Sequence, residues 1–144
     1  MDVNIYLMNN IKSNHPTVGD YIYVLQKEDT DVTLTKEGEL EETTKNQAEL
    51  AVLLMAVKRV NRPCELKIFT ENSYLASGIT SWLSGWIKKG FKDSKGEDIK
   101  HKELWQQLAA ELQEHQVQVL LKEPNQFKDW MIAEIKKKEK QNGN

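Results

Sequence analysis

The order of structural elements is decided by residues 68–108, IFTENSYLASGITSWLSGWIKKGFKDSKGEDIKHKELWQQL. This segment begins inside ELKIFT (65–70), a run of alternating apolar residues that predicts a β-strand. From Asn72 onward the apolar residues adopt helical spacing, at Tyr74, Leu75, Ile79 and Trp82. A lysine-rich connection then leads to a second amphipathic pattern over 102–114. The segment therefore predicts a strand followed by helices.

The residues before this segment predict strands first and a helix afterwards. Apolar and β-branched runs at 3–8 and 21–26, and the alternating DVTLT at 31–35, predict three strands of an antiparallel meander. KEGEL (36–40) is interpreted as the turn that follows them. From Thr44 the apolar residues again follow helical spacing, and the Asn-Arg-Pro sequence at 61–63 ends that helix.

After the central segment, QVQVLL (116–121) predicts a last strand and 126–138 a last amphipathic helix. The expected order is β-β-β-α-β-α-α-α-β-α. A meander followed by β-α-β units indicates a mixed sheet with helices packed on it. The predicted class is α/β, of the α+β kind. We expect one domain over 1–138 and a flexible polar tail over 139–144.

Composition limits the function classes that remain. The chain of 144 residues carries a formal net charge of −2, so its overall charge indicates neither a nucleic acid nor a membrane partner. No run of about 18 apolar residues could span a membrane, and the N-terminus lacks a signal-peptide pattern. The single cysteine, Cys64, excludes an internal disulfide and is typical of a cytoplasmic protein. The three histidines have no zinc-site spacing.

Several motifs in this order resemble the type 1 ribonuclease H family of bacteria. They are TTKNQAEL (43–50), FTENSYL (69–75), GIT (78–80), GWIKKGFK (85–92), EDIKHKELWQQL (97–108) and NQFKDW (125–130). The resemblance covers almost the whole chain. It implies a ribonuclease H-like fold, a five-stranded mixed sheet flanked by helices. It also implies metal-dependent endonucleolytic cleavage of the RNA strand of an RNA–DNA hybrid, with four carboxylates holding two Mg²⁺ or Mn²⁺ ions.

Three of the four carboxylate positions are acidic in this chain. Glu49 matches the glutamate of the first helix, Glu71 the aspartate that closes the central strand, and Asp129 the aspartate of the last helix. The resemblance implies that all three are catalytic metal ligands. Glu71 is longer than the family's aspartate by one methylene, and a misplacement of about 1 Å can reduce a rate on the order of 100-fold.

The fourth position is occupied by Met8, which aligns with the aspartate ending the first strand. A thioether is a soft, neutral ligand and a poor substitute for the carboxylate that bridges both ions. The histidine-bearing loop of the family is shortened here to KEPN, 122–125. We therefore expect weakened binding of Mg²⁺ or Mn²⁺, and nuclease activity that is weak or lost.

The predicted substrate surface combines a basic protrusion with a polar edge. The resemblance implies that the protrusion contacts the DNA strand through Trp82, Trp86, Lys88, Lys89 and Lys92. Asn46, Gln47 and Asn72 would contact the RNA strand, where 2′-hydroxyls distinguish RNA from DNA. The alternative is that the tryptophans only pack the helix and the lysines only solvate it.

Two functions remain open from the sequence. One is an impaired hydrolase, a ribonuclease H-type endonuclease acting on RNA–DNA hybrids. The other is a catalytically inactive nucleic-acid-binding or protein-interaction module on the same scaffold. In both cases the partner is a nucleic acid or a protein, and a monomer is the default state.

Overall fold

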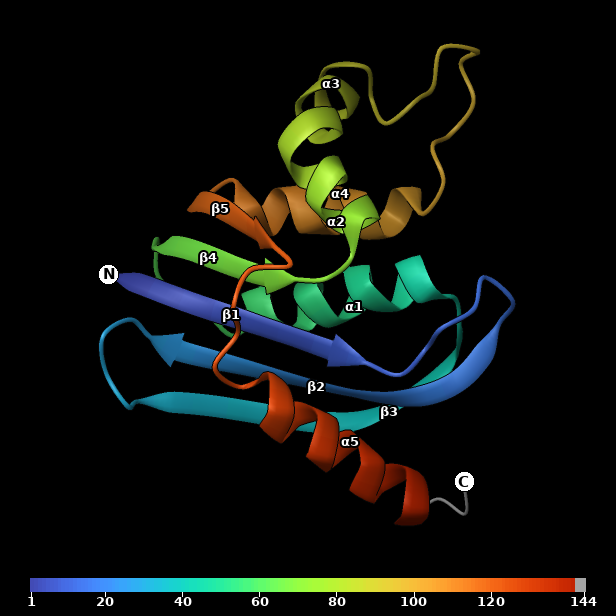
Figure 1. Ribbon diagram of the computed structural model, residues 1–144. Helices are drawn as coiled ribbons and strands as arrows, with labels where there is room; N and C mark the ends of the chain where they lie inside the picture. Colours follow the sequence, from blue (N-terminus) through green and yellow to red (C-terminus); the bar gives the residue numbers. More distant parts are fainter. Residues whose placement is uncertain (142–144) are drawn as a thin grey trace.

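The computed structural model describes residues 1–141 and contains one five-stranded sheet in the order β3-β2-β1-β4-β5 (Figure 1). The strands are β1 (Asp2–Asn9), β2 (Thr17–Lys27), β3 (Thr33–Thr43), β4 (Glu65–Thr70) and β5 (Gln116–Leu121). β1, β2 and β3 are antiparallel neighbours, whereas β4 runs parallel to β1 and to β5. The predicted five-stranded mixed sheet is confirmed.

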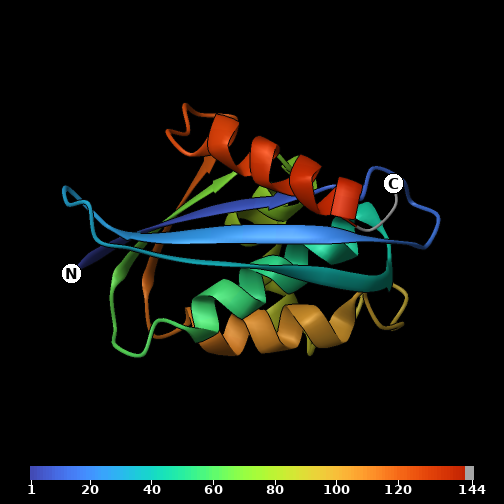
Figure 2. The same cartoon turned by 90° about the horizontal axis from the view of Figure 1, so that it is seen from below.

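Helices cover both faces of this sheet. They are α1 (Lys45–Lys58), α2 (Ser73–Ser77), the π-helical η1 (Gly78–Trp82), α3 (Leu83–Lys88), α4 (Lys102–Leu112) and α5 (Lys128–Gln141). α1 and α4 lie on one face and α5 on the other, and α3 projects beyond the sheet (Figures 1 and 2). Within residues 1–141, no helix is both long enough and apolar enough to cross a membrane.

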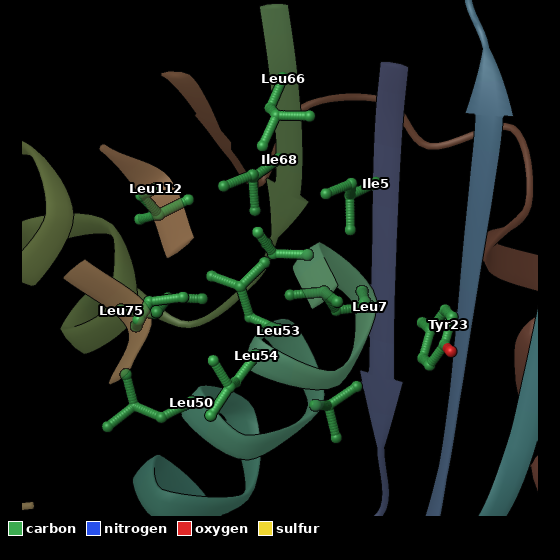
Figure 3. Packing of buried hydrophobic residues seen from close by; sticks show 14 of the residues in the cluster. Ile5, Leu7, Tyr23, Leu50, Leu53, Leu54, Leu66, Ile68, Leu75 and Leu112 are labelled. Carbon is green, nitrogen blue, oxygen red and sulfur yellow. The ribbon is translucent and has the colours of Figure 1, made fainter. Parts of the chain in front are cut away.

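The larger hydrophobic core lies between the sheet and α1, α2 and α4 (Figure 3). α1 is buried around most of its circumference because it lies between the sheet and α4. Trp105 of α4 is fully buried, and its indole N–H donates to the hydroxyl of Tyr74 at 3.0 Å. A buried indole needs such an acceptor, since an unpaired buried N–H is costly.

A smaller core lies under α5 on the opposite face. It contains Tyr6, Ile22, Val24, Met131 and Ile135. Tyr6 stacks on Phe69 of the neighbouring strand, with ring centroids 4.5 Å apart. β1 is consequently buried on both faces, as a central strand should be.

Several boundaries differ from the sequence-based expectations, and two of these differences change an assignment. KEGEL (36–40) is not a turn, because β3 continues through it and pairs with β2, with Gly38 opposite Tyr21. A Cβ on Gly38 would lie 2.8 Å from Cε1 of Tyr21, so the glycine makes room for this ring. Residues 139–141, which we assigned to the tail, are helical, and Glu139 accepts a hydrogen bond from Nδ2 of Asn10 at 3.0 Å. The rest of the expected tail, 142–144, lies outside the described residues.

The close approach of Gly78 to Trp105 gives a stability prediction. A Cβ on Gly78 would lie 2.2 Å from Cη2 of the buried indole, so Gly78→Ala must displace it. We expect a loss of about 1–3 kcal/mol in the free energy of unfolding, measured by urea denaturation. Gly85→Ala is the matched control, because no atom lies within 4 Å of its Cβ position. An unchanged midpoint for Gly78→Ala would contradict this packing.

Candidate functional site

The candidate site lies where the parallel strands β1 and β4 end side by side. Tyr6 of β1 pairs with Phe69 of β4, so Met8 and Glu71 follow at matching positions beyond the paired residues. The N-terminal half of α1 crosses the same edge and contributes Glu49. These three side chains line one hollow of about 300 Å³. The structure therefore brings together three of the four positions that the resemblance singled out.

Glu49 is the buried acid of this hollow. Its Oε1 accepts a hydrogen bond from Nδ2 of Asn9 at 3.0 Å, and its Oε2 accepts a short hydrogen bond from the hydroxyl of Thr70. Burial raises the pKa of Glu49, and the negative charge of Glu71 raises it further. The hydrogen bonds from Thr70 and Asn9 and the charge of Lys45 act in the opposite direction.

Glu71 and Asp129 have different surroundings. The carboxylate of Glu71 is largely exposed and accepts a hydrogen bond from Nζ of Lys128 at 2.7 Å. This contact raises the pKa of Lys128, and the charge of Asp129 adds to the shift. Asp129 is exposed on the first turn of α5 and does not line the hollow. Among residues 1–141, no three His, Cys, Asp or Glu side chains are grouped closely enough to hold a metal ion.

Of the three polar residues expected beside the RNA strand, Asn72 lines the hollow, Asn46 contacts Asn72, and Gln47 does not line the hollow. Asn72 is buried, and its Oδ1 accepts from the backbone N–H of Leu75 at 2.9 Å and so caps α2. Its Nδ2 donates to Oδ1 of Asn46 at 3.2 Å. Oε1 of Gln47 accepts from the hydroxyl of Thr43 at 3.1 Å. Asn46 and Asn72 are therefore adjacent.

The basic protrusion is formed by α3 and the loop after it. Trp82 is 41% exposed, whereas Trp86 is partly buried and packs on Trp105, with ring centroids 5.1 Å apart. Lys88 and Lys89 are exposed. A third lysine of the protrusion, Lys92, forms a short ion pair with Asp98 and lowers the pKa of this acid. Trp86 thus anchors the protrusion, and Trp82, Lys88 and Lys89 remain open to a ligand.

Sequence reasoning missed four contributors to the site. Thr70 could have been found from the sequence. Leu66, Ile68 and Thr70 are spaced two residues apart on one strand, so their side chains lie on the same face, toward α1. Lys12, Lys45 and Lys128 carried no such signal. They come from segments far apart in the chain, and only the fold brings them to one place.

Known proteins resemble this chain in sequence and in structure. The RNase H family model matches residues 3–121. Ribonuclease HI of Xylella fastidiosa (strain 9a5c) is 35% identical over 116 residues, covering 81% of this chain and 75% of that protein. Ribonuclease H of Campylobacter curvus (strain 525.92) is 36% identical over 104 residues, covering 72% of this chain and 68% of that protein.

Solved structures share the fold at lower sequence identity. The foamy viral protease–reverse transcriptase in complex with double-stranded DNA superimposes with a TM-score of 0.72 at 16% identity, covering 94% of this chain and 88% of that chain. LC11-RNase H1 in complex with an RNA/DNA hybrid superimposes with a TM-score of 0.66 at 18% identity, covering 94% of this chain and 97% of that chain. The fold, the order of motifs and the curated relatives agree: this chain belongs to the type 1 ribonuclease H family.

Proposed function

We propose that this protein binds RNA–DNA hybrids and does not hydrolyse their RNA strand. The observation that carries the proposal is Met8, which stands at the end of β1 beside Glu49 and Glu71. Binding is supported by the family and by relatives such as LC11-RNase H1, which was solved with a hybrid. The exposed Trp82 and the exposed lysines of the protrusion support it further.

The residues of the hollow do not fit a pair of divalent ions. Mg²⁺ and Mn²⁺ prefer anionic oxygen ligands, and the thioether of Met8 offers neither charge nor oxygen. Both oxygens of Glu49 already accept hydrogen bonds, and Glu71 is paired with an ammonium group. The hollow therefore lacks the ligand set that a two-metal hydrolytic step would need.

A second candidate is a weak metal-dependent nuclease. It is favoured by Glu49 and Glu71, whose carboxyl groups face the same hollow and interact electrostatically. One acid added at position 8 would complete a set of three oxygen ligands. Direct assay of cleavage separates the two candidates.

We expect no cleavage of a labelled RNA–DNA hybrid by excess protein in Mg²⁺ or Mn²⁺, measured by denaturing electrophoresis. Binding of the same hybrid should be retained in a filter-binding assay. The double variant Met8→Asp/Glu71→Asp is the control, and it should bind Mn²⁺ more tightly than the wild type by calorimetry, because it adds a carboxylate at the end of β1. Metal-dependent cleavage of the RNA strand by the wild type would contradict the proposal and favour the second candidate.

Burial of Glu49 predicts a pH-dependent stability. Its pKa is raised in the folded state, so the proton is bound more tightly there than in the unfolded chain. The resulting stabilisation is complete below the ordinary value of 4.5 and is lost as the pH rises through the raised value. Glu49→Gln, which stays neutral, should gain free energy of unfolding relative to the wild type as the pH rises.

Urea denaturation at pH values from below 4.5 upward, without added metal, measures the difference in free energy of unfolding between Glu49→Gln and the wild type. Glu103→Gln, at an exposed position on α4, controls for the loss of one negative charge. A difference between Glu49→Gln and the wild type that does not change with pH would show that the buried carboxyl does not titrate as expected.

The exposed tryptophan of the protrusion predicts a binding defect. Trp82→Ala should weaken hybrid binding at least about fivefold, because packing of an indole against nucleotide groups contributes roughly 1 kcal/mol or more. Trp130→Ala is the matched control, because Trp130 is equally open, at 43% exposed against 41%, but lies on α5. Equal binding by the two variants would indicate that Trp82 only packs α3.

A further inference from the structure

We propose that Lys12 and Lys45 bind a backbone phosphate of the nucleic acid directly, in the hollow between the end of β1 and the start of α1, without a metal ion. This inference rests on the proposed hybrid binding. It names the contact that the hybrid makes in this hollow. The ligand class is a phosphodiester, and the binding groups are two ammonium groups of this chain.

The two lysines are brought together by a specific backbone contact. The N–H of Lys45 donates to the carbonyl oxygen of Ser13 at 2.9 Å, which holds the segment after β1 against the first turn of α1. Lys12 and Lys45 line the same hollow of about 300 Å³, together with Asn9 and Asn72. Both lysines are exposed, so a phosphate can approach them from solvent.

Among the described residues, neither ammonium has an ion-pair or hydrogen-bond partner, although the charge of Lys45 acts on the buried Glu49. Within residues 1–141, Lys12 and Lys45 form no ion pair and their side chains make no hydrogen bond. One N–H of each neighbouring amide is already used: Nδ2 of Asn9 donates to Glu49, and Nδ2 of Asn72 donates to Asn46. The lysines are therefore the positively charged donors of the hollow that remain available to a ligand.

The acids of the hollow do not cancel this positive charge. Glu49 lines the hollow but is buried, and its two oxygens accept hydrogen bonds from Asn9 and Thr70. The carboxylate of Glu71 is paired with Nζ of Lys128 at 2.7 Å. A hollow with exposed ammonium groups, and with its carboxylates buried or paired, attracts an anion. An ammonium is an effective point charge for phosphate oxygens.

The test compares Lys12→Gln/Lys45→Gln with Lys36→Gln/Lys58→Gln. The control removes the same charge at two exposed lysines, one on the edge strand β3 and one at the far end of α1. Binding of a labelled RNA–DNA hybrid is measured over a salt series in EDTA. Thermal unfolding of each variant confirms that it is folded.

We expect the wild type to bind at least as tightly in EDTA as in Mg²⁺ at the same ionic strength, because Mg²⁺ competes with the lysines for phosphate. Loss of one phosphate contact should reduce the slope of log K against log salt by about 0.9, so the test variant should lose about 1 in slope. Its affinity at about 0.1 M salt should fall roughly tenfold or more. The control variant should keep the wild-type slope.

Two results overturn the inference while leaving hybrid binding intact. One is a Lys12→Gln/Lys45→Gln variant with the wild-type affinity and slope. The other is wild-type binding that EDTA abolishes, since a metal would then hold the phosphate. A wild type that binds no hybrid in either buffer overturns the proposed function itself, and the two failures are therefore distinguishable.

Lys128 provides a second test, because its assigned role is to neutralise Glu71. Lys128→Gln should weaken hybrid binding, since the free carboxylate would repel the phosphate. Adding Glu71→Gln to this variant should restore binding toward the wild-type value. Absence of this rescue would overturn the role of Lys128 in the site.

Discussion

The parallel pairing of β1 with β4 at the centre of the sheet is the constraint on which the rest of the structure depends. β1 is covered by α1 on one face and by α5 on the other, so its polar side chains must find partners inside the protein. Asn4 and Tyr6 both donate to Oε1 of Gln26 on β2, at 3.2 and 3.0 Å. The same pairing ends both strands at one edge, and it thereby creates the hollow that contains Met8 and Glu71.

Glu49 connects the three elements that meet at this edge. It is carried by α1, and it accepts hydrogen bonds from Asn9 at the end of β1 and from Thr70 at the end of β4. A buried carboxyl group with two such donors positions the helix on the sheet whether or not it ever contacts a metal ion. Retention of this residue in a chain with Met8 therefore has a structural reason. A scaffold of this kind can be kept while its chemistry changes.

Much of the fold could be predicted, because hydrophobic periodicity depends on neighbours in the chain. The five strands and the helices over 44–60 and 102–114 were found from this pattern alone. KEGEL was misjudged because its charges and its glycine are typical of a turn, whereas here they lie on the exposed edge strand β3. Charged residues on an edge strand are favourable since they discourage pairing with another chain.

The sequence by itself determined the family and the fold, because motifs and residue types are local properties. From the resemblance it also predicted that Met8 stands where the family has an aspartate. Only the tertiary structure decided which groups share the hollow. It placed Lys12 and Lys45 beside Asn9, paired Lys128 with Glu71, and left Asp129 outside. The physical reason is that electrostatic interactions depend on distance through space and on burial, and neither quantity is encoded in the local pattern of the chain.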